Sequence, residues 1–372
     1  MPDPLRIAYF AHTLRSDWNN GNAHFLRGLV RALIAQGHQV TVFEQEENWS
    51  TQNLLSEGEL GAQSLAHFDQ TYPEISIQHY TLDPQSLGAH LRDTDIVIVH
   101  EWNSPELIGL LLNVRDELHF RTLFHDTHHR ASSTPESIKL LQVWRFDGVL
   151  VFGAALRAIY LQRFGLEHVW TLHEAADTTI FHPAATPITT PEQDVVWIGN
   201  WGDDERAAEI KQFLLDPAVH LRDQARFAIH GVRYPETALT ALNQAGVRYA
   251  GYLPNLQAPR AYASSRITLH IPRQLYSGAM AGIPTIRVFE ALAAGIPLIS
   301  APWHDVERLF SEGDFLVAEN TAEMTAHIRH LLDNPADAQA QADRGLSTVL
   351  AHHTCSHRAE QLAGICHEVL AQ

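Results

Sequence analysis

Cysteine is almost absent from the sequence, and so are long apolar runs. Cys355 and Cys366 are the only cysteines among 372 residues. Two thiols cannot build a disulfide framework, so we expect a protein of the reducing cytoplasm. No stretch of about 18 uncharged apolar residues occurs, so we expect no transmembrane segment and at most peripheral membrane contact. The opening residues also lack the order of basic, apolar and small residues that marks a signal peptide.

Positive charge is scarce too. The chain carries 26 lysines and arginines against 43 aspartates and glutamates, a formal net charge of -17. Proteins that bind nucleic acid need clustered cations to neutralise phosphates, so we expect no nucleic-acid partner. Lys139 and Lys211 are the only lysines, and arginine supplies the remaining cations. Arginine suits bidentate phosphate binding, although codon bias explains the same imbalance.

What the sequence does contain is a regular alternation of short apolar runs and amphipathic stretches. This alternation predicts parallel sheets with crossover helices, and 372 residues suffice for two such α/β domains. Residues 23–35 carry apolar side chains at helical spacing and are followed by Gly37, which suits a helix end. The expected strands are 6–11, 39–43, 75–80, 96–100, 121–124, 148–151, 195–199, 226–230, 248–250, 267–271, 297–300 and 315–318.

A change of composition divides the sequence into two parts. Residues 177–194 are rich in proline and threonine and show no periodicity, which predicts an interdomain linker. We therefore expect a first Rossmann-like domain over residues 1–178, a linker over 179–194 and a second Rossmann-like domain over 195–352.

The most informative segment is 286–297, IRVFEALAAGIP, in which Glu290 lies on a predicted helix that ends at Gly295. A carboxylate near the start of a helix can accept the hydroxyls of a ribose in a bidentate manner. The free amides of the same helix start can bind a diphosphate. The residues alone equally allow an amphipathic helix with a surface glutamate and a glycine cap.

This segment resembles the E-A-x-A-x-G-x-P motif of GT-B glycosyltransferases, both the retaining family 4 and the CgeB-like group. Three further segments are similar to landmarks of these proteins and occur in the same order. They are the opening IAYFAHT…GNAHFLRGLV, then LHEAADTTIFHP, then VVWIGNWGDDER. The resemblance implies two doubly wound Rossmann-like domains facing a cleft. It also implies that the last segment, 353–372, is a helix crossing back to the first domain, with apolar residues at 3,4 spacing: Leu362, Ile365, Val369 and Leu370.

The activity implied is transfer of a sugar from a nucleoside diphosphate sugar, UDP or GDP, with retention of configuration. Neither a metal nor a cofactor beyond the donor co-substrate is implied. The acceptor can be a sugar, a lipid, a protein or a small molecule. A nucleotide-sugar epimerase of the same fold, or a catalytically degenerate nucleotide-binding module, remains the alternative.

One departure from the family pattern concerns the donor sugar. Family 4 proteins carry a second glutamate eight residues before the position of Glu290, where this chain has Gly282. That glutamate usually contacts the sugar, so the identity of the sugar cannot be carried over. Arg287 completes an R-x-F-E pattern closer to the CgeB-like group, and it either faces the diphosphate or bridges to an acidic neighbour.

His125 directly follows the predicted strand 121–124. Parallel α/β sheets place ligands at the carboxyl ends of their strands, and the position is similar to a family histidine that approaches the donor sugar. A histidine that merely caps the strand is the alternative. Asp126, His128 and His129 complete a cluster that could also bind a metal, but the resemblance implies a metal-independent site.

The phosphate-binding residues are expected after the strand 195–199. Gly199, Asn200 and Gly202 form a turn whose amides can bind phosphate. Arg206, Lys211 and Arg273 are the cationic candidates, each of which can also be an ordinary surface residue. At least one is needed, because a dianionic leaving group requires compensation.

Two further candidates lie in the first half. Gly21 allows close approach of a substrate to the loop after the first strand. This loop lacks G-x-G-x-x-G, which weakens a dinucleotide oxidoreductase hypothesis. Glu101, after the strand 96–100, is a general base if the reaction inverts, or else a cap of the following helix.

Overall fold

The computed structural model describes residues 3–186, 190–202 and 204–372. Residues 187–189 of the predicted linker and Asp203 of the predicted phosphate loop lie outside this set. The chain divides into two compact units. The first unit comprises Met1–Glu174 and Cys355–Gln372, and the second comprises Ala175–Thr354. Among the described residues, none of the helices has the length and apolarity that crossing a bilayer requires.

The first unit is built on a seven-stranded parallel sheet with the order β3-β2-β1-β4-β5-β6-β7. Every residue of β4 is buried, as expected for a central parallel strand covered by helices on both faces. The strands are β1 Arg6–Phe10, β2 Gln39–Gln45, β3 Ser76–Tyr80, β4 Ile96–His100, β5 Arg121–Asp126, β6 Gly148–Val151 and β7 Val169–Thr171.

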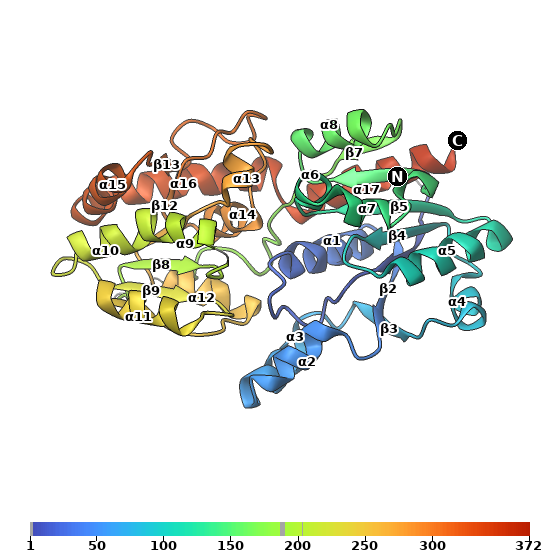
Figure 1. The fold of residues 1–372 in the computed structure, drawn as a ribbon, viewed down its shortest axis with the longest axis horizontal. Helices are drawn as coiled ribbons and strands as arrows, with labels where there is room; N and C mark the ends of the chain where they lie inside the picture. The colour runs from blue at the N-terminus through green and yellow to red at the C-terminus, as the bar shows by residue number, and fades with distance from the viewer. Residues whose placement is uncertain (1–2, 187–189, 203) are drawn as a thin grey trace. The chain divides into compact units, whose positions relative to one another are not determined.

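The helices of the first unit form because their apolar side chains recur on one face. In α1 the spacing buries Phe25, Leu26, Leu29 and Leu33. The helices are α1 Ala23–Ala35, α2 Trp49–Ser56, α3 Glu59–Thr71, α4 Pro84–Leu91, α5 Pro105–Leu118, α6 Arg130–Ser133, α7 Pro135–Lys139, α8 Ala154–Arg163 and α17 Cys355–Leu370, with a 3-10 turn at Val143–Arg145 (Figure 1).

The last helix, α17, belongs to the first unit although the second unit precedes it in the chain. It packs against α1, where the Cys355 thiol lies 3.9 Å from the Phe25 carbonyl oxygen. The side-chain carboxamide of Gln36 donates to the Ser356 carbonyl oxygen at 3.1 Å. Leu362, Ile365 and Val369 are buried, whereas Leu370 is partly exposed.

The second unit contains a six-stranded parallel sheet with the order β10-β9-β8-β11-β12-β13. Its core includes Trp197, Ile229, Leu269 and Ile299. The strands are β8 Val195–Ile198, β9 Phe227–His230, β10 Val247–Tyr249, β11 Ile267–His270, β12 Leu298–Ser300 and β13 Leu316–Val317. The helices are α9 Asp204–Ile210, a π-helical turn Lys211–Leu215, α10 Asp216–His220, α11 Glu236–Ala245, a 3-10 turn Asn255–Gln257, α12 Ala258–Ala263, α13 Gln274–Ser277, α14 Ile286–Ala293, α15 Thr321–Asp333 and α16 Pro335–His352.

Each sheet therefore has a point where the strand order reverses. In the first unit this point lies between β1 and β4, and in the second between β8 and β11. The crossover helices leave the two adjacent strands toward opposite faces, so a crevice opens at their carboxyl ends, where doubly wound proteins bind ligands. The predicted doubly wound fold class is confirmed, and each unit presents one such edge.

The loop that follows β1 is held by a buried carboxylate. Glu44 is 1% exposed and accepts hydrogen bonds from the amides of Leu14 at 2.5 Å and Arg15 at 3.2 Å. The Thr13 hydroxyl donates to the same carboxylate at 3.2 Å. Burial raises the pKa of Glu44 despite these bonds.

Glu44→Ala should therefore destabilise the protein by about 3 kcal/mol, because it leaves the Thr13 hydroxyl and the amides of Leu14 and Arg15, the last only partly buried, without an acceptor. Urea unfolding measures the loss, and Glu46→Ala, an exposed neighbour two residues along the chain, is the matched control. Equal stability of the two variants would show that Glu44 does not hold this loop.

Candidate functional site

At the reversal point of the second sheet, the turn after β8 is tied to the turn after β9. The Gly199 amide donates to the His230 carbonyl oxygen at 2.9 Å, and the Tyr234 hydroxyl donates to the Gly199 carbonyl oxygen at 2.7 Å. The Asn200 carboxamide oxygen accepts from the Val232 amide at 2.9 Å. The Gly199 amide, which we expected to bind phosphate, is therefore already bonded within the sheet. Gly199 serves the site by fixing the turn.

Two arginines meet at Gly202 in this turn. Gly202 has a φ of +77°, and a Cβ there would lie 2.9 Å from the Cβ of Arg206 and 3.3 Å from Nη2 of Arg273. Arg206 is 9% exposed, lies over the Trp197 ring at 5.1 Å and donates to Glu209 at 3.2 Å. Burial lowers the pKa of Arg206 and the charge of Arg273 lowers it further, against the opposing effect of Glu209. Two guanidinium groups thus repel each other at the edge where a ligand is expected, and an anion would stabilise both.

The start of α14 lies near the same edge. The Thr285 hydroxyl lies 3.1 Å from Nε2 of His270, whose Nδ1 lies 2.9 Å from the Ser300 hydroxyl. Burial and the charge of Arg206 lower the pKa of His270 to about 3, so this imidazole is neutral at physiological pH. Within the described residues, the Thr285 side chain makes no capping bond to α14. The first amides of α14 are therefore suited to bind an anion.

Glu290 lies on α14 but is completely buried among protein donors. Asn255 donates to its carboxylate at 3.0 Å, Arg287 forms an ion pair with it, and the Tyr262 hydroxyl also bonds to it. At least three protein side chains therefore engage the carboxylate of Glu290. The bidentate contact with a ribose stays a prediction, and it requires Glu290 to exchange these protein donors for hydroxyls. Of the two alternatives for Arg287, the structure shows the bridge to an acidic neighbour.

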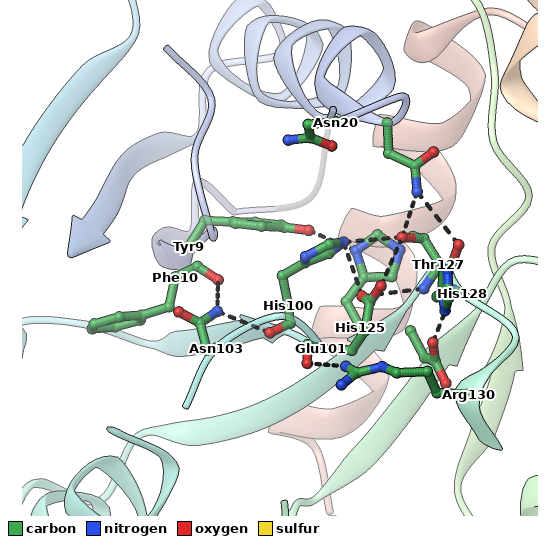
Figure 2. Close-up of polar contacts among 12 residues, drawn as sticks. Tyr9, Phe10, Asn20, His100, Glu101, Asn103, His125, Thr127, His128 and Arg130 are labelled. Atoms are coloured by element: carbon green, nitrogen blue, oxygen red, sulfur yellow. Dashed lines mark hydrogen bonds and ion pairs between the residues drawn. The ribbon is translucent and has the colours of Figure 1, made fainter. Parts of the chain in front are cut away.

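In the first unit, His100 and His125 lie opposite each other on β4 and β5. Because β5 continues to Asp126, His125 lies inside the strand rather than directly after it, as we had expected. His125 is fully buried, and its Nδ1 lies 2.6 Å from the Tyr9 hydroxyl (Figure 2). Burial and the charge of His100 lower its pKa to about 3, so it is neutral. Its Nε2 forms no hydrogen bond with any described residue.

Glu101 follows β4 and is fully buried as an anion. Its carboxylate lies 2.9 Å from Nε2 of His100 and accepts from the Thr127 amide and hydroxyl, both at 3.3 Å (Figure 2). Burial alone would raise the pKa of Glu101, but the interactions with His100, His128 and Arg130 together lower it to about 2. Such a carboxylate is a weak base. Ser104, not Glu101, caps α5. The capping role suggested for Glu101 therefore belongs to Ser104, and the role of general base stays a prediction.

The sequence relationships agree with this picture. Residues 206–364, which contain Arg206, Arg273 and Glu290, match the model of the family described as glycosyl transferase-like. Over this segment the chain is similar to glycosyl transferases. No curated protein sequence matches it significantly.

Solved structures share the fold of this chain over nearly its whole length. An α-glucosyltransferase in complex with UDP and a 13-mer DNA has a TM-score of 0.73 at 12% identity, covering 98% of this chain and 100% of that one. Anabaena HepE in complex with UDP and glucose has a TM-score of 0.71 at 11% identity, covering 97% and 98%. Sucrose-phosphate synthase from Thermosynechococcus elongatus has a TM-score of 0.65 at 14% identity, covering 99% of both chains. At these identities the likeness establishes the GT-B fold.

Two positions in the second unit bear on the expectations drawn from the sequence. The Lys211 ammonium forms an ion pair with Asp216 at 2.8 Å, and its side chain is 67% exposed, so it gives no support to a role beside Arg206. Gly282 has a φ of +91°, and a Cβ there would lie 2.2 Å from a methyl carbon of Val306. The glycine is therefore required by the backbone and by the space that Val306 occupies. A side chain at this position needs the strained positive φ and a shift of the Val306 methyl group.

The sequence also pointed to the neighbourhood of His125 without showing which residues interact. Asp126 accepts from the Tyr160 hydroxyl at 2.6 Å and from the His128 amide at 2.9 Å. Asn22, beside the exposed Gly21, donates to the Thr127 hydroxyl at 2.7 Å and so joins the loop after β1 to the end of β5. Among the described residues, no three histidine, cysteine, aspartate or glutamate side chains are grouped to hold a metal ion. The polar cluster is a hydrogen-bonded network.

Asp126 should make stability depend on pH. Burial and the charge of Glu101 raise its pKa from 3.8 to about 7. Between these values the folded protein binds a proton that the unfolded chain has released, so the free energy of unfolding falls as the pH rises. We expect the wild type to lose more stability between about pH 4 and pH 7 than Asp126→Asn, by urea unfolding at both ends of this window. Asp93→Asn, whose side chain is 89% exposed, is the control, and an unchanged slope in Asp126→Asn would contradict the assignment.

Proposed function

We propose that this glycosyltransferase transfers a sugar from a nucleoside diphosphate sugar, with UDP as the nucleotide, and that its second unit holds the donor. The observation that carries the proposal is the meeting of Arg206 and Arg273 at the reversal point of the second sheet. Two guanidinium groups provide the positive charge that a leaving diphosphate requires, so the proposed site needs no metal. UDP is favoured because the α-glucosyltransferase and HepE structures were each solved with it.

The proposed donor contacts follow from the geometry. Arg206 and Arg273 bind the diphosphate, together with the first amides of α14. Glu290 keeps Arg287 in place and exchanges one of its protein donors for a ribose hydroxyl. Asn200 and Gly199 fix the turn that carries Gly202.

Retention of configuration is part of the proposal. The only carboxylate expected as a base, Glu101, has its pKa lowered to about 2 and is engaged with His100 and Thr127. This favours a reaction in which the leaving phosphate itself accepts the proton of the acceptor. The neutral His125 offers its Nε2 as a hydrogen-bonding group, and contact with a sugar requires the side chains that enclose it to open.

A thermal-shift series with UDP, GDP, ADP and dTDP tests the donor assignment. A ligand at about 100 times its Kd stabilises the folded state by about 2.7 kcal/mol, which is easily measured. We expect UDP to raise the Tm most. A larger shift with another nucleotide would overturn UDP, and no shift with any of them would overturn the donor site.

An assay of free UDP then separates the possible activities. A glycosyltransferase releases UDP from UDP-sugar faster when an acceptor is present. Acceptor-independent isomerisation of the sugar would show an epimerase instead, and binding without turnover of any UDP-sugar would show a degenerate module.

A further inference from the structure

Trp102 is an exposed aromatic side chain at the reversal point of the first sheet. It follows β4 by two residues, and 45% of its surface is exposed. The residues on either side of it are buried: Glu101 is fully buried and Asn103 is 8% exposed. The indole is thus the part of this segment that meets solvent, at the edge where a doubly wound sheet binds its ligand.

The backbone beneath Trp102 is fixed from both sides. The Asn103 carboxamide donates to the carbonyl oxygens of Phe10 and His100, both at 2.8 Å (Figure 2). Arg130 donates to the carbonyl oxygen of Glu101 on the other side. Because the backbone that carries Trp102 is already ordered, packing a ligand on the indole costs little conformational entropy.

Polar side chains surround the indole. The Arg130 guanidinium lies 4.1 Å from the ring centroid, and the His128 ring lies 4.9 Å away, edge to face. The buried Nε of Arg130 has no hydrogen-bond partner among the described residues. The His129 ring lies 3.9 Å from that of His128. The guanidinium of Arg130 therefore lies over one face of the indole, and the exposed remainder of the ring is bordered by imidazoles that can bond to hydroxyl groups.

We propose that Trp102, Arg130 and His128 form the binding site for the acceptor and that the acceptor is a saccharide. The inference rests on the proposed glycosyl transfer. A pyranose has an apolar face of C–H groups that packs on an indole and a rim of hydroxyls that bonds to polar neighbours. A lipid chain would instead need a continuous apolar surface, whereas the neighbours of Trp102 are cationic and polar. The acceptor sugar can be free or part of a larger glycoconjugate.

Saturation-transfer NMR on the full chain tests this site without any donor. The probes are methyl glucoside, maltose, N-acetylglucosamine and octyl glucoside below its micellar concentration. The variants are Trp102→Ala, Trp102→Phe and, as the matched control, Trp144→Ala, whose side chain is also exposed, at 58%, and lies in the same unit. The UDP-induced thermal shift of every variant reports separately on the second unit.

We expect saccharide ring protons to receive saturation in the wild type and in Trp144→Ala. Affinity should fall about tenfold or more in Trp102→Ala and recover in part in Trp102→Phe, because a smaller aromatic ring keeps part of the platform. With octyl glucoside, the protons of the sugar ring should receive the saturation if the site binds a sugar, whether that sugar is free or linked to a lipid. A weaker response to octyl glucoside than to maltose would favour a free saccharide.

Three results would overturn the inference. Saccharide signals that are absent or insensitive to Trp102→Ala exclude the platform. A Trp102-dependent signal confined to the octyl chain makes it a lipid site. If Trp102→Ala loses its UDP-induced thermal shift together with sugar binding, and Trp102→Phe also fails to bind sugar, the loss reflects damage to the fold and the platform is rejected. Loss of the UDP response in the wild type, by contrast, would reject the proposed donor and leave the sugar result standing.

Discussion

Arg273→Gln is expected to lower kcat/KM for the donor by roughly 100- to 1,000-fold, because it removes one of the two guanidinium groups proposed to bind the diphosphate. Arg206 and Arg273 both approach Gly202, and the charge of Arg273 lowers the pKa of Arg206. The variant should also bind UDP more weakly. Steady-state kinetics with UDP-sugar and calorimetric titration with UDP measure the two effects.

The same variant makes a second prediction of opposite sign. Without nucleotide, Arg273→Gln should be slightly more stable than the wild type, since Arg206 is freed from the repulsion of a neighbouring charge. Arg329→Gln is the matched control, an exposed arginine of the second unit that bonds to Gln224 and should leave kinetics and UDP affinity unchanged. An Arg273→Gln enzyme with wild-type kcat/KM and UDP affinity would remove the pair from the donor site.

Glu290→Ala is expected to destabilise the protein by about 3–5 kcal/mol, because it removes one partner of a buried ion pair. Glu290 is completely buried, and its loss leaves Arg287, Asn255 and Tyr262 without their common acceptor. Urea unfolding measures the change. Glu290→Gln, which keeps the shape and one acceptor oxygen, should lose less.

The control for Glu290 is Glu236→Ala, an exposed glutamate at the start of α11. It should change the free energy of unfolding by at most about 1 kcal/mol. A Glu290→Ala variant as stable as this control, but deficient in UDP binding, would restore the bidentate ribose contact that the sequence suggested. A double variant with Arg287→Ala should be less destabilised than the two single changes summed, because the pair then disappears together.

The strand pattern shows where sequence reasoning works and where it fails. The expected strand 96–100 and helix 23–35 coincide with β4 and α1, because buried parallel strands and amphipathic helices leave strong apolar periodicities. The three-residue strand β7 is too short to leave such a pattern. At the end of β5, His125 and Asp126 are polar and looked like a loop, but they pair with Leu150 and Val151 of β6.

The sequence by itself determined the two α/β series, the order of the family landmarks and most of the polar residues at the strand ends. These features depend on the spacing of residues close together in the sequence, so they can be predicted without knowing the tertiary structure. It did not determine which of those residues act together. Arg206 and Arg273 meet because β8 and β11 are neighbours in space although distant in sequence. Lys211 instead forms an ion pair with nearby Asp216.

Tertiary structure alone also decided the charge states and the accessibility of the site. Nothing in the spacing of FEALAAG shows that Asn255 and Tyr262 enclose Glu290. Likewise, the pKa of Glu101 is low because His128 and Arg130, from another segment, act together with His100 against the burial that would raise it. Desolvation and long-range hydrogen bonds set both properties, and they arise only once distant segments have packed together.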